Sequence, residues 1–160
     1  MSKKIIKLKR IKVTVETCTG CRTCELVCSY VHTRKFSPST SRIIVIKNDV
    51  IGMDYPVMCH QCDDCTVLQN CPTAALSKNI DETISIDYKK CIGCGNCIRT
   101  CKYSAVKIYE NKPIICDLCD GVPKCVIKCP TKALIFENIV EPEDPQIEYE
   151  KFMKEWNKTE

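Results

Sequence analysis

The stretch CIGCGNCIRTC, from Cys91 to Cys101, decides the fold because it places four cysteines at gaps of two, two and three residues. CTGCRTCELVC, from Cys18 to Cys28, repeats the same gaps. Two further groups, CHQCDDCTVLQNC and CDLCDGVPKCVIKC, keep most of this rhythm and stretch one gap each. A unit that occurs four times is an internal repeat, and here the repeated feature is a set of four thiols.

The cysteine content limits the chain to two classes of protein. Sixteen of the 160 residues are cysteine, a fraction typical of secreted disulfide scaffolds or of metal proteins. The segment MSKKIIKLKRIKVTVE offers no signal-peptide core and no twin arginine, and its alternating Ile11, Val13 and Val15 predict a strand. We therefore expect a cytoplasmic protein with reduced thiols, unless a partner subunit carries an export signal for both.

Two other classes are disfavoured by the sequence. No apolar run approaches the roughly 20 residues of a membrane helix, so we expect no membrane insertion. The formal net charge is +4, and the lysines alternate with apolar residues, as expected for the solvent-exposed face of a strand. The chain is also poor in aromatic residues, so we do not expect nucleic-acid binding.

The cysteine spacing indicates the metal chemistry. Cys-x2-Cys-x2-Cys-x3-Cys is the ligand pattern of a 4Fe–4S cluster, because three closely spaced thiolates reach three corners of an iron–sulfur cube. Gly20, Gly93 and Gly95 would let backbone amides approach the sulfurs. Structural zinc takes paired cysteines or histidines, and the two histidines, His32 and His60, stand singly. The sequence thus predicts four 4Fe–4S clusters rather than zinc or disulfides.

The stretched gap before Cys71 has a simple interpretation. In two-cluster ferredoxins the fourth cysteine of each group ligates the other cluster. The long gap therefore lies outside the loop that binds the cluster of its own group. From the residues alone, two pairings stay open: the second and third groups inside the first and fourth, or two sequential ferredoxins.

Short hairpins are predicted between the groups. RIIVIKNDVIGM turns at Asn48-Asp49, ALSKNIDETISIDYKKC leads into the third group with Ile84 and Ile86 on one face, and AVKIYENKPIIC turns between Glu110 and Pro113. Together with short helices near the cysteines, this pattern predicts an α+β fold.

Two further segments carry predictions. Pro72 and Pro130 each follow the last cysteine of a group and precede Ala and Leu, which predicts one short helical turn at each place. The tail at 141–160 is acidic and holds Trp156. We expect it to be helical, either as a solvated end of its own domain or as a docking arm for a partner.

These motifs resemble a known family, the four-cluster ferredoxin-like electron-transfer subunits of molybdopterin and tungstopterin oxidoreductases, carbon monoxide dehydrogenases and related enzymes. The resemblance spans roughly Val13 to Phe136 and rests on CTGCRTCELVC, CIGCGNCIRTC, KPIICDLCDGVPKCVIKCPTKAL and FSPSTSRIIV. The last stretch, a linker, and the first motif most resemble the small iron–sulfur subunits of tungsten-dependent aldehyde oxidoreductases.

The resemblance implies two bacterial-ferredoxin-like dicluster units, one nested within the other. An outer unit from 13–50 and 102–137 would enclose an inner unit at 51–101, in a four-cluster domain at 1–140 followed by the tail. The implied ligands are Cys18, Cys21, Cys24 and Cys129 for cluster 1; Cys59, Cys62, Cys65 and Cys101 for cluster 2; Cys91, Cys94, Cys97 and Cys71 for cluster 3; and Cys116, Cys119, Cys125 and Cys28 for cluster 4.

The sequence departs from the family pattern at three places. The family often places the third cysteine of the second group two residues later, where Val67 stands, so Cys65 takes that role here. Ser29 and Lys102 replace a proline that commonly follows the fourth cysteine. Because that proline only helps to turn the chain, we expect little effect on ligation.

Sixteen cysteines make four complete ligand sets, which leaves no open iron for a substrate. The resemblance therefore implies a non-catalytic subunit that passes single electrons between a catalytic oxidoreductase subunit and a soluble carrier such as ferredoxin. A tungstopterin aldehyde oxidoreductase is the expected partner. A carbon monoxide dehydrogenase, hydrogenase or formate dehydrogenase partner, or a free-standing polyferredoxin, are the alternatives. Arg42 resembles an arginine of the family linker and is a candidate for a role near a cluster or an interface.

Overall fold

The computed structural model describes residues 9–50 and 52–138, and residues 147, 150, 151 and 154 of the tail. The four described tail residues are helical, whereas Trp156 lies outside the described residues. In the part of the chain that the structure describes, no helix combines the length and the apolar character needed to cross a membrane.

The fold is built from paired strands, short α-helices and two single 3-10 turns. Four two-stranded antiparallel sheets join β1 to β8, β2 to β3, β4 to β5 and β6 to β7. The strands are β1 Lys9–Val13, β2 Ile43–Asn48, β3 Met53–Met58, β4 Leu76–Lys78, β5 Ile84–Ile86, β6 Lys107–Tyr109, β7 Lys112–Ile114 and β8 Leu134–Asn138. The helices are α1 Thr23–Thr33, α2 Thr66–Gln69, α3 Asn96–Thr100 and α4 Lys124–Lys128, with 3-10 turns at Val15–Thr17 and Pro38–Thr40. The predicted small mixed α+β fold is confirmed.

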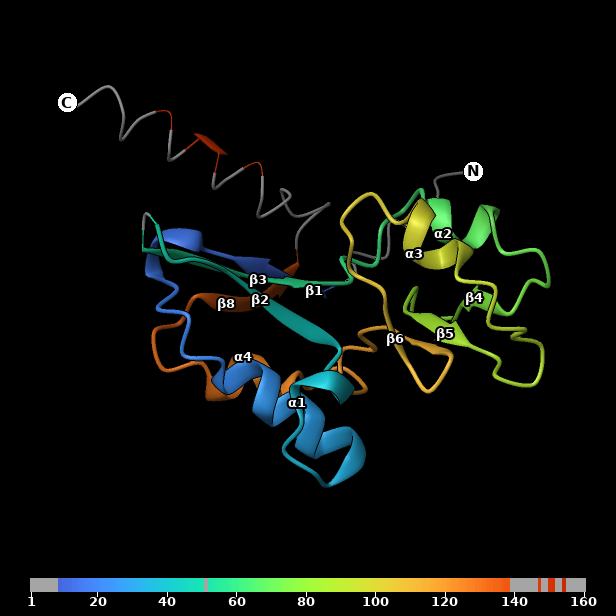
Figure 1. Ribbon diagram of the computed structural model, residues 1–160, viewed down its shortest axis with the longest axis horizontal. Helices are drawn as coiled ribbons and strands as arrows, with labels where there is room; N and C mark the ends of the chain where they lie inside the picture. Colours follow the sequence, from blue (N-terminus) through green and yellow to red (C-terminus); the bar gives the residue numbers. More distant parts are fainter. Residues whose placement is uncertain (1–8, 51, 139–146, 148–149, 152–153, 155–160) are drawn as a thin grey trace.

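Segments far apart in the sequence lie side by side at one end of the molecule. β1 pairs with β8, so that Lys9 lies opposite Asn138 and Val13 opposite Leu134. Beside this pair, α1 packs against α4, while α2 packs against α3 elsewhere. Figure 1 shows β1, β2, β3, β8, α1 and α4 at one end and α2, α3, β4 and β5 at the other.

The buried residues form two cores, one at each end. The first core contains Ile11, Val13, Val15, Ile43, Val45, Tyr55, Val57, Met58, Leu118 and Leu134 together with Cys24, Cys28, Cys116 and Cys125. The second contains Val67, Leu76, Ile84, Val106 and Ile115 together with Cys62, Cys65 and Cys97. Cys59, Cys101 and Tyr103 pack against both cores and mark the seam between them.

The three predicted hairpins are present. In the first, β3 begins only at Met53, because the Asn48 side chain accepts a hydrogen bond from the amide of Val50 at 3.2 Å and extends the turn. In the β6–β7 hairpin, Glu110 and Asn111 both have positive φ angles, 48° and 59°, as a two-residue type I′ turn requires.

The prediction of a helical turn after Pro72 and Pro130 is wrong. Both prolines begin tight turns that lead directly into strands β4 and β8. Helix cannot continue there because Ala74 and Lys132 take left-handed φ angles of 47° and 61°. The short helices instead precede the cysteines: α2 ends at Gln69 and α4 ends at Lys128.

Candidate metal centres

All sixteen cysteines lie in the described part of the chain, and none of them forms a disulfide. Eight of them line two cavities, four in each, and each cavity combines three cysteines of one group with one of another. The other eight belong to the first and fourth groups. The four ligand sets expected from the sequence are named here by their first triplet cysteine: the Cys18, Cys59, Cys91 and Cys116 sets.

The Cys59 set lines a cavity at the seam. This cavity measures about 370 Å3 with its mouth included, and four thiols face it, those of Cys59, Cys62, Cys65 and Cys101. Burial raises the pKa of Cys59 well above its ordinary value, and the nearby thiols of Cys116, Cys62 and Cys65 raise it further. Val67 also lines the cavity, but its apolar side chain cannot ligate iron, whereas Cys65 offers a sulfur there.

The Cys91 set lines a second cavity, of about 360 Å3, next to Gly93 and Gly95. Its thiols are those of Cys91, Cys94, Cys97 and Cys71. Cys71 comes from the group before, at the end of the stretched gap. Cys94 is exposed, whereas Cys97 is buried, so this cavity lies close to the surface.

The expected Cys18 set would join the first and fourth groups through Cys18, Cys21, Cys24 and Cys129. Burial raises the pKa of Cys18, and the neighbouring Asp54, Cys129 and Cys21 add to the shift. Burial likewise raises the pKa of Cys24 to about 12, with Cys18 and Cys21 adding to it. Cys21 is therefore an electrostatic neighbour of both Cys18 and Cys24, and Cys129 is one of Cys18.

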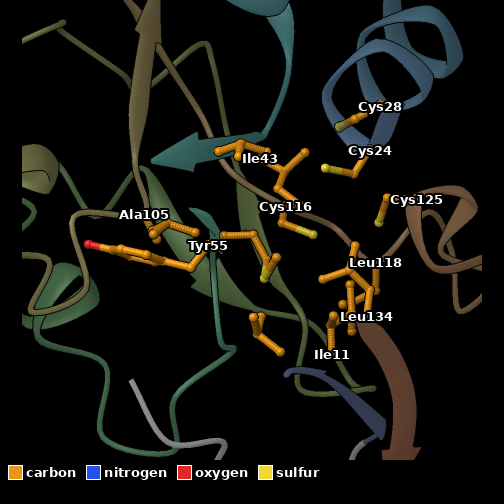
Figure 2. Packing of buried hydrophobic residues seen from close by; sticks show 14 of the residues in the cluster. Ile11, Cys24, Cys28, Ile43, Tyr55, Ala105, Cys116, Leu118, Cys125 and Leu134 are labelled. Carbon is orange, nitrogen blue, oxygen red and sulfur yellow. The ribbon is translucent and has the colours of Figure 1, made fainter. Parts of the chain in front are cut away.

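The expected Cys116 set consists of Cys116, Cys119, Cys125 and Cys28. Cys28 lies in α1, and Cys28, Cys116 and Cys125 belong to the first core. Burial raises the pKa of Cys116 to about 12, and the nearby thiols of Cys28 and Cys119 contribute. Burial also raises the pKa of Cys125, again with Cys116, Cys28 and Cys119 as neighbours. Figure 2 shows Cys24, Cys28, Cys116 and Cys125 gathered between α1 and the buried apolar side chains.

The same turn follows the fourth cysteine of the second group, Cys71, and that of the third group, Cys101. The amide of Ala75 donates to Cys71 Sγ at 3.3 Å, and the amide of Ala105 donates to Cys101 Sγ at 3.4 Å. In each case the residue before the alanine has a positive φ, 47° at Ala74 and 51° at Ser104. Amide hydrogen bonds to a thiolate sulfur stabilise its charge and orient it for a metal.

This turn does not require a proline directly after the cysteine. Lys102 follows Cys101 where Pro72 follows Cys71, yet both turns bring the fourth residue's amide onto the sulfur. Cys28 differs because it lies within α1, and there the donor is the amide of Arg42 at 3.3 Å. These hydrogen-bond donors were not predicted from the sequence. An alanine stands four residues after the last cysteine of three groups, at Ala75, Ala105 and Ala133, and this repeat could have indicated them.

Charged side chains surround the Cys116 set. His32 Nδ1 lies 2.7 Å from the carbonyl oxygen of Cys28, and Nε2 lies 3.2 Å from a carboxylate oxygen of Asp117. Both partners only accept hydrogen bonds, so both ring nitrogens donate and the imidazole is charged. The hydrogen bond to Asp117 is the main reason that the pKa of His32 rises to about 10.

Asp117 is shared by two cations. Its carboxylate also pairs with the guanidinium of Arg42. Burial would raise the pKa of Asp117, but the hydrogen bond from His32 and the pairing with Arg42 hold it far below its usual range. His32, Asp117 and Cys119 have ligand atoms within 4.8 Å of one another, but both His32 nitrogens already donate, so these residues do not favour a separate cation site.

The comparisons with known proteins agree with this donor chemistry. A family model described as a 4Fe-4S dicluster domain matches residues 53–102. The polyferredoxin-like subunit of an aliphatic sulfonate oxidoreductase from Pyrococcus furiosus is 39% identical over 134 residues, which cover 81% of this chain and 76% of that protein. The putative electron transport protein YsaA of Escherichia coli is 37% identical over 131 residues, covering 73% of this chain and 82% of YsaA.

A solved structure resembles the fold as a whole. It is described as the active site complex BamBC of benzoyl coenzyme A reductase as isolated, and the matching chain gives a TM-score of 0.51 at 25% identity. The match covers 92% of this chain and 87% of that chain.

The cysteine sets and the matched family fit together. Four sulfur donors are the full complement of a 4Fe–4S cluster, and each of the two cavities supplies four. With sixteen cysteines in ferredoxin-like motifs and the matched family, multiple 4Fe–4S clusters are the cofactor of the protein. On the cysteine motifs, their grouping in the structure and the relatives, the chain belongs to the 4Fe–4S ferredoxin-like electron-transfer family.

Proposed function

We propose that this chain is the electron-transfer subunit of an oxidoreductase complex and passes single electrons through four 4Fe–4S clusters. The observation that carries the proposal is the pair of cavities, each lined by four cysteines of which one comes from another group. No other ionisable group is needed for ligation at either cavity. When bound, each cluster takes up and releases one electron, and the protein sets its potential and position.

The ligand sets are proposed as follows. Cys18, Cys21, Cys24 and Cys129 hold cluster 1; Cys59, Cys62, Cys65 and Cys101 hold cluster 2; Cys91, Cys94, Cys97 and Cys71 hold cluster 3; Cys116, Cys119, Cys125 and Cys28 hold cluster 4. For clusters 2 and 3 the support is a shared cavity. For clusters 1 and 4 the support is the mutual effect of the thiols on one another's pKa.

We propose that the two dicluster units are nested. The matched dicluster domain at 53–102 supports an inner unit at 51–101, because it contains the second and third cysteine groups and neither of the others. Pairing of β1 with β8 and packing of α1 on α4 support an outer unit from 13–50 and 102–137. Strand β3 belongs to the inner segment, but its Tyr55, Val57 and Met58 are buried in the first core. The inner segment therefore contributes apolar side chains to the core of the outer unit.

We propose that the sets follow one another in the order Cys18, Cys116, Cys59 and Cys91. Cys24 of the Cys18 set is an electrostatic neighbour of Cys125 of the Cys116 set, and Cys116 is one of Cys59, which supports the first two steps. Packing of α2 on α3 supports the third step, because α2 follows Cys65 and α3 contains Cys97. Among the sixteen cysteines, Cys21 and Cys94 are the exposed ones, and they belong to the two outermost sets. A line of sites that reaches the surface at both ends supports a relay between two partners.

The partners proposed are a catalytic subunit and a soluble carrier such as ferredoxin, with the chain itself non-catalytic and cytoplasmic. The relatives include a subunit of an aliphatic sulfonate oxidoreductase and hydrogenase-4 component A of Escherichia coli, the latter 29% identical over 159 residues. The linker FSPSTSRIIV and the first cysteine motif favour a tungstopterin aldehyde oxidoreductase as the catalytic partner. A hydrogenase partner is the second candidate, and the hydrogenase-4 relative favours it.

Anaerobic purification of the untagged chain from its native cells tests this function. We expect about sixteen irons and as many sulfides per chain, and co-elution with a larger subunit that contains tungsten and pterin. A nickel-containing partner would identify the hydrogenase alternative. A monomer that elutes alone and accepts electrons without a partner would contradict the subunit proposal.

A further inference from the structure

Gln61 is buried at the seam between the two cores in an unusual backbone conformation. Its side chain is 0% exposed, and its φ angle is +54°, a left-handed value that disfavours a glutamine. A buried primary amide is tolerated only where hydrogen bonds replace its water. Specific partners must therefore hold Gln61 in this position.

Those partners come from three segments of the chain. Gln61 Nε2 donates to the carbonyl oxygen of Cys116 at 2.6 Å, and Oε1 accepts from the amide of Ile84 at 2.7 Å. The backbone carbonyl of Gln61 accepts from Arg10 Nη2 at 3.1 Å. The guanidinium of Arg10 also pairs with the carboxylate of Asp63, two residues further along the same loop. Arg10 therefore holds the backbone of this loop, while Ile84 and Cys116 hold the Gln61 side chain.

These hydrogen bonds cross the seam. Cys116 belongs to the first core, whereas Cys62 and Ile84 belong to the second. Gln61 lies directly between Cys59 and Cys62 in the sequence, and Cys59 and Cys116 are neighbouring thiols. The amide of Gln61 therefore joins the loop of the Cys59 set to the backbone of a cysteine in the Cys116 set.

We propose that Gln61 is a positioning residue that couples the two dicluster units. It holds the loop of Cys59 and Cys62 against Cys116 and supplies a hydrogen-bonded path between the two ligand sets. An electron that moves between these sets crosses this contact with no bond formed or broken. The proposal rests on the ligand sets proposed above for clusters 2 and 4.

The test uses the full chain with its clusters assembled, in wild-type form and as Gln61→Met and Gln61→Asn variants. Methionine keeps the volume but removes both hydrogen bonds. Asparagine keeps the amide and tolerates the left-handed backbone, but it is one methylene too short to reach both partners. The matched control is Gln69→Met, at an exposed glutamine whose amide contacts only the surface carboxylate of Asp64 among the described hydrogen bonds.

Three measurements are made on each protein: iron content, magnetic interaction between reduced clusters by electron paramagnetic resonance, and amide hydrogen exchange at Ile84. With full iron content, we expect both Gln61 variants to weaken the interaction between the clusters of the Cys59 and Cys116 sets, because the loop is no longer held against Cys116. Because the Ile84 amide loses its acceptor, its exchange should become roughly five-fold faster. The Gln69→Met control should match wild type in all three.

Two results overturn the proposal. If exchange at Ile84 accelerates while the magnetic interaction is unchanged, Gln61 has only a structural role. If both variants lose iron from the Cys59 and Cys116 sets, residue 61 serves cluster assembly rather than coupling. Failure of the proposed function would look different, because the wild-type chain itself would then hold fewer than four clusters.

Discussion

Arg42 and Asp117 form an ion pair although 75 residues separate them in the sequence. The same arginine donates its backbone amide to Cys28 Sγ at 3.3 Å, and Asp117 directly follows Cys116. The ion pair thus ties the linker after α1 to the fourth cysteine group, beside Cys28 and Cys116. Arg42 was a candidate from sequence, and the structure shows which residues it contacts.

Removal of this arginine side chain should lower the reduction potential at the Cys116 set. In Arg42→Gln the backbone amide that donates to Cys28 is retained, but the Asp117 carboxylate loses its guanidinium partner. His32 still pairs with the carboxylate, but one positive charge beside the cluster is lost, which disfavours its reduced state, so we expect a shift of tens of millivolts to lower potential. A potentiometric titration followed by electron paramagnetic resonance measures it. Arg34→Gln, at an exposed arginine that packs over Tyr30, is the control; an equal shift there would refute a local effect.

Cys71→Ser and Cys101→Ser should give reciprocal defects. We expect loss of Cys71 to perturb the cluster of Cys91, Cys94 and Cys97, and loss of Cys101 to perturb that of Cys59, Cys62 and Cys65, because each crossing cysteine lines the other group's cavity. Site-resolved Mössbauer or electron paramagnetic resonance spectra report which cluster changes. Damage confined to the mutated residue's own group in both variants would rule out the crossed ligands.

Removal of iron should unfold the chain. Seven buried members of the two cores are cysteines, four in the first and three in the second, so we expect cluster binding to supply much of the folding free energy. We expect anaerobic chelation to abolish the circular dichroism signal of the helices and strands, and reconstitution with iron and sulfide to restore it. Native secondary structure that persists in the chelated protein would contradict this expectation.

Gly20→Ala should damage the first cluster site more than Gly95→Ala damages the third, because the Asp54 side chain must move at Gly20 and nothing must move at Gly95. Both glycines have left-handed φ angles, 60° and 73°, so either alanine carries about 1–2 kcal/mol of backbone strain. Only at Gly20 would the new Cβ also lie 1.8 Å from a carboxylate oxygen of Asp54, whereas nothing lies within 4 Å of it at Gly95. Iron content per chain and the melting temperature measure the difference, and equal losses would show that strain alone matters.

The sequence allowed the cysteine chemistry and the hairpins to be predicted because both are local. The gaps in CIGCGNCIRTC and the turn residues Glu110 and Asn111 are visible within a dozen positions. The helical turns after Pro72 and Pro130 were predicted wrongly because Pro-Thr-Ala suits a helix start, and nothing local shows that Ala74 and Lys132 become left-handed.

The surroundings of the sites could not be predicted for the opposite reason. His32 looked isolated, but it meets Asp117 across 85 positions, and Gln61 meets Cys116 across 55. Such contacts depend on how the two cores are placed against each other, which no spacing rule encodes. The burial of Arg10 and Gln61 could not be predicted either, because a sequence pattern predicts polar side chains to be exposed.

The pairing of β1 with β8 has a consequence for biosynthesis. Residues 53–102 leave the ribosome with all the thiols of the two inner sets, whereas the thiols of Cys18, Cys21 and Cys24 await Cys129, and β1 awaits β8. With the ligand sets proposed above, the inner unit can receive its clusters while translation continues. The outer unit can be filled only once the last strand has emerged, so the N-terminal thiolates depend longest on protection from oxygen and from stray metal.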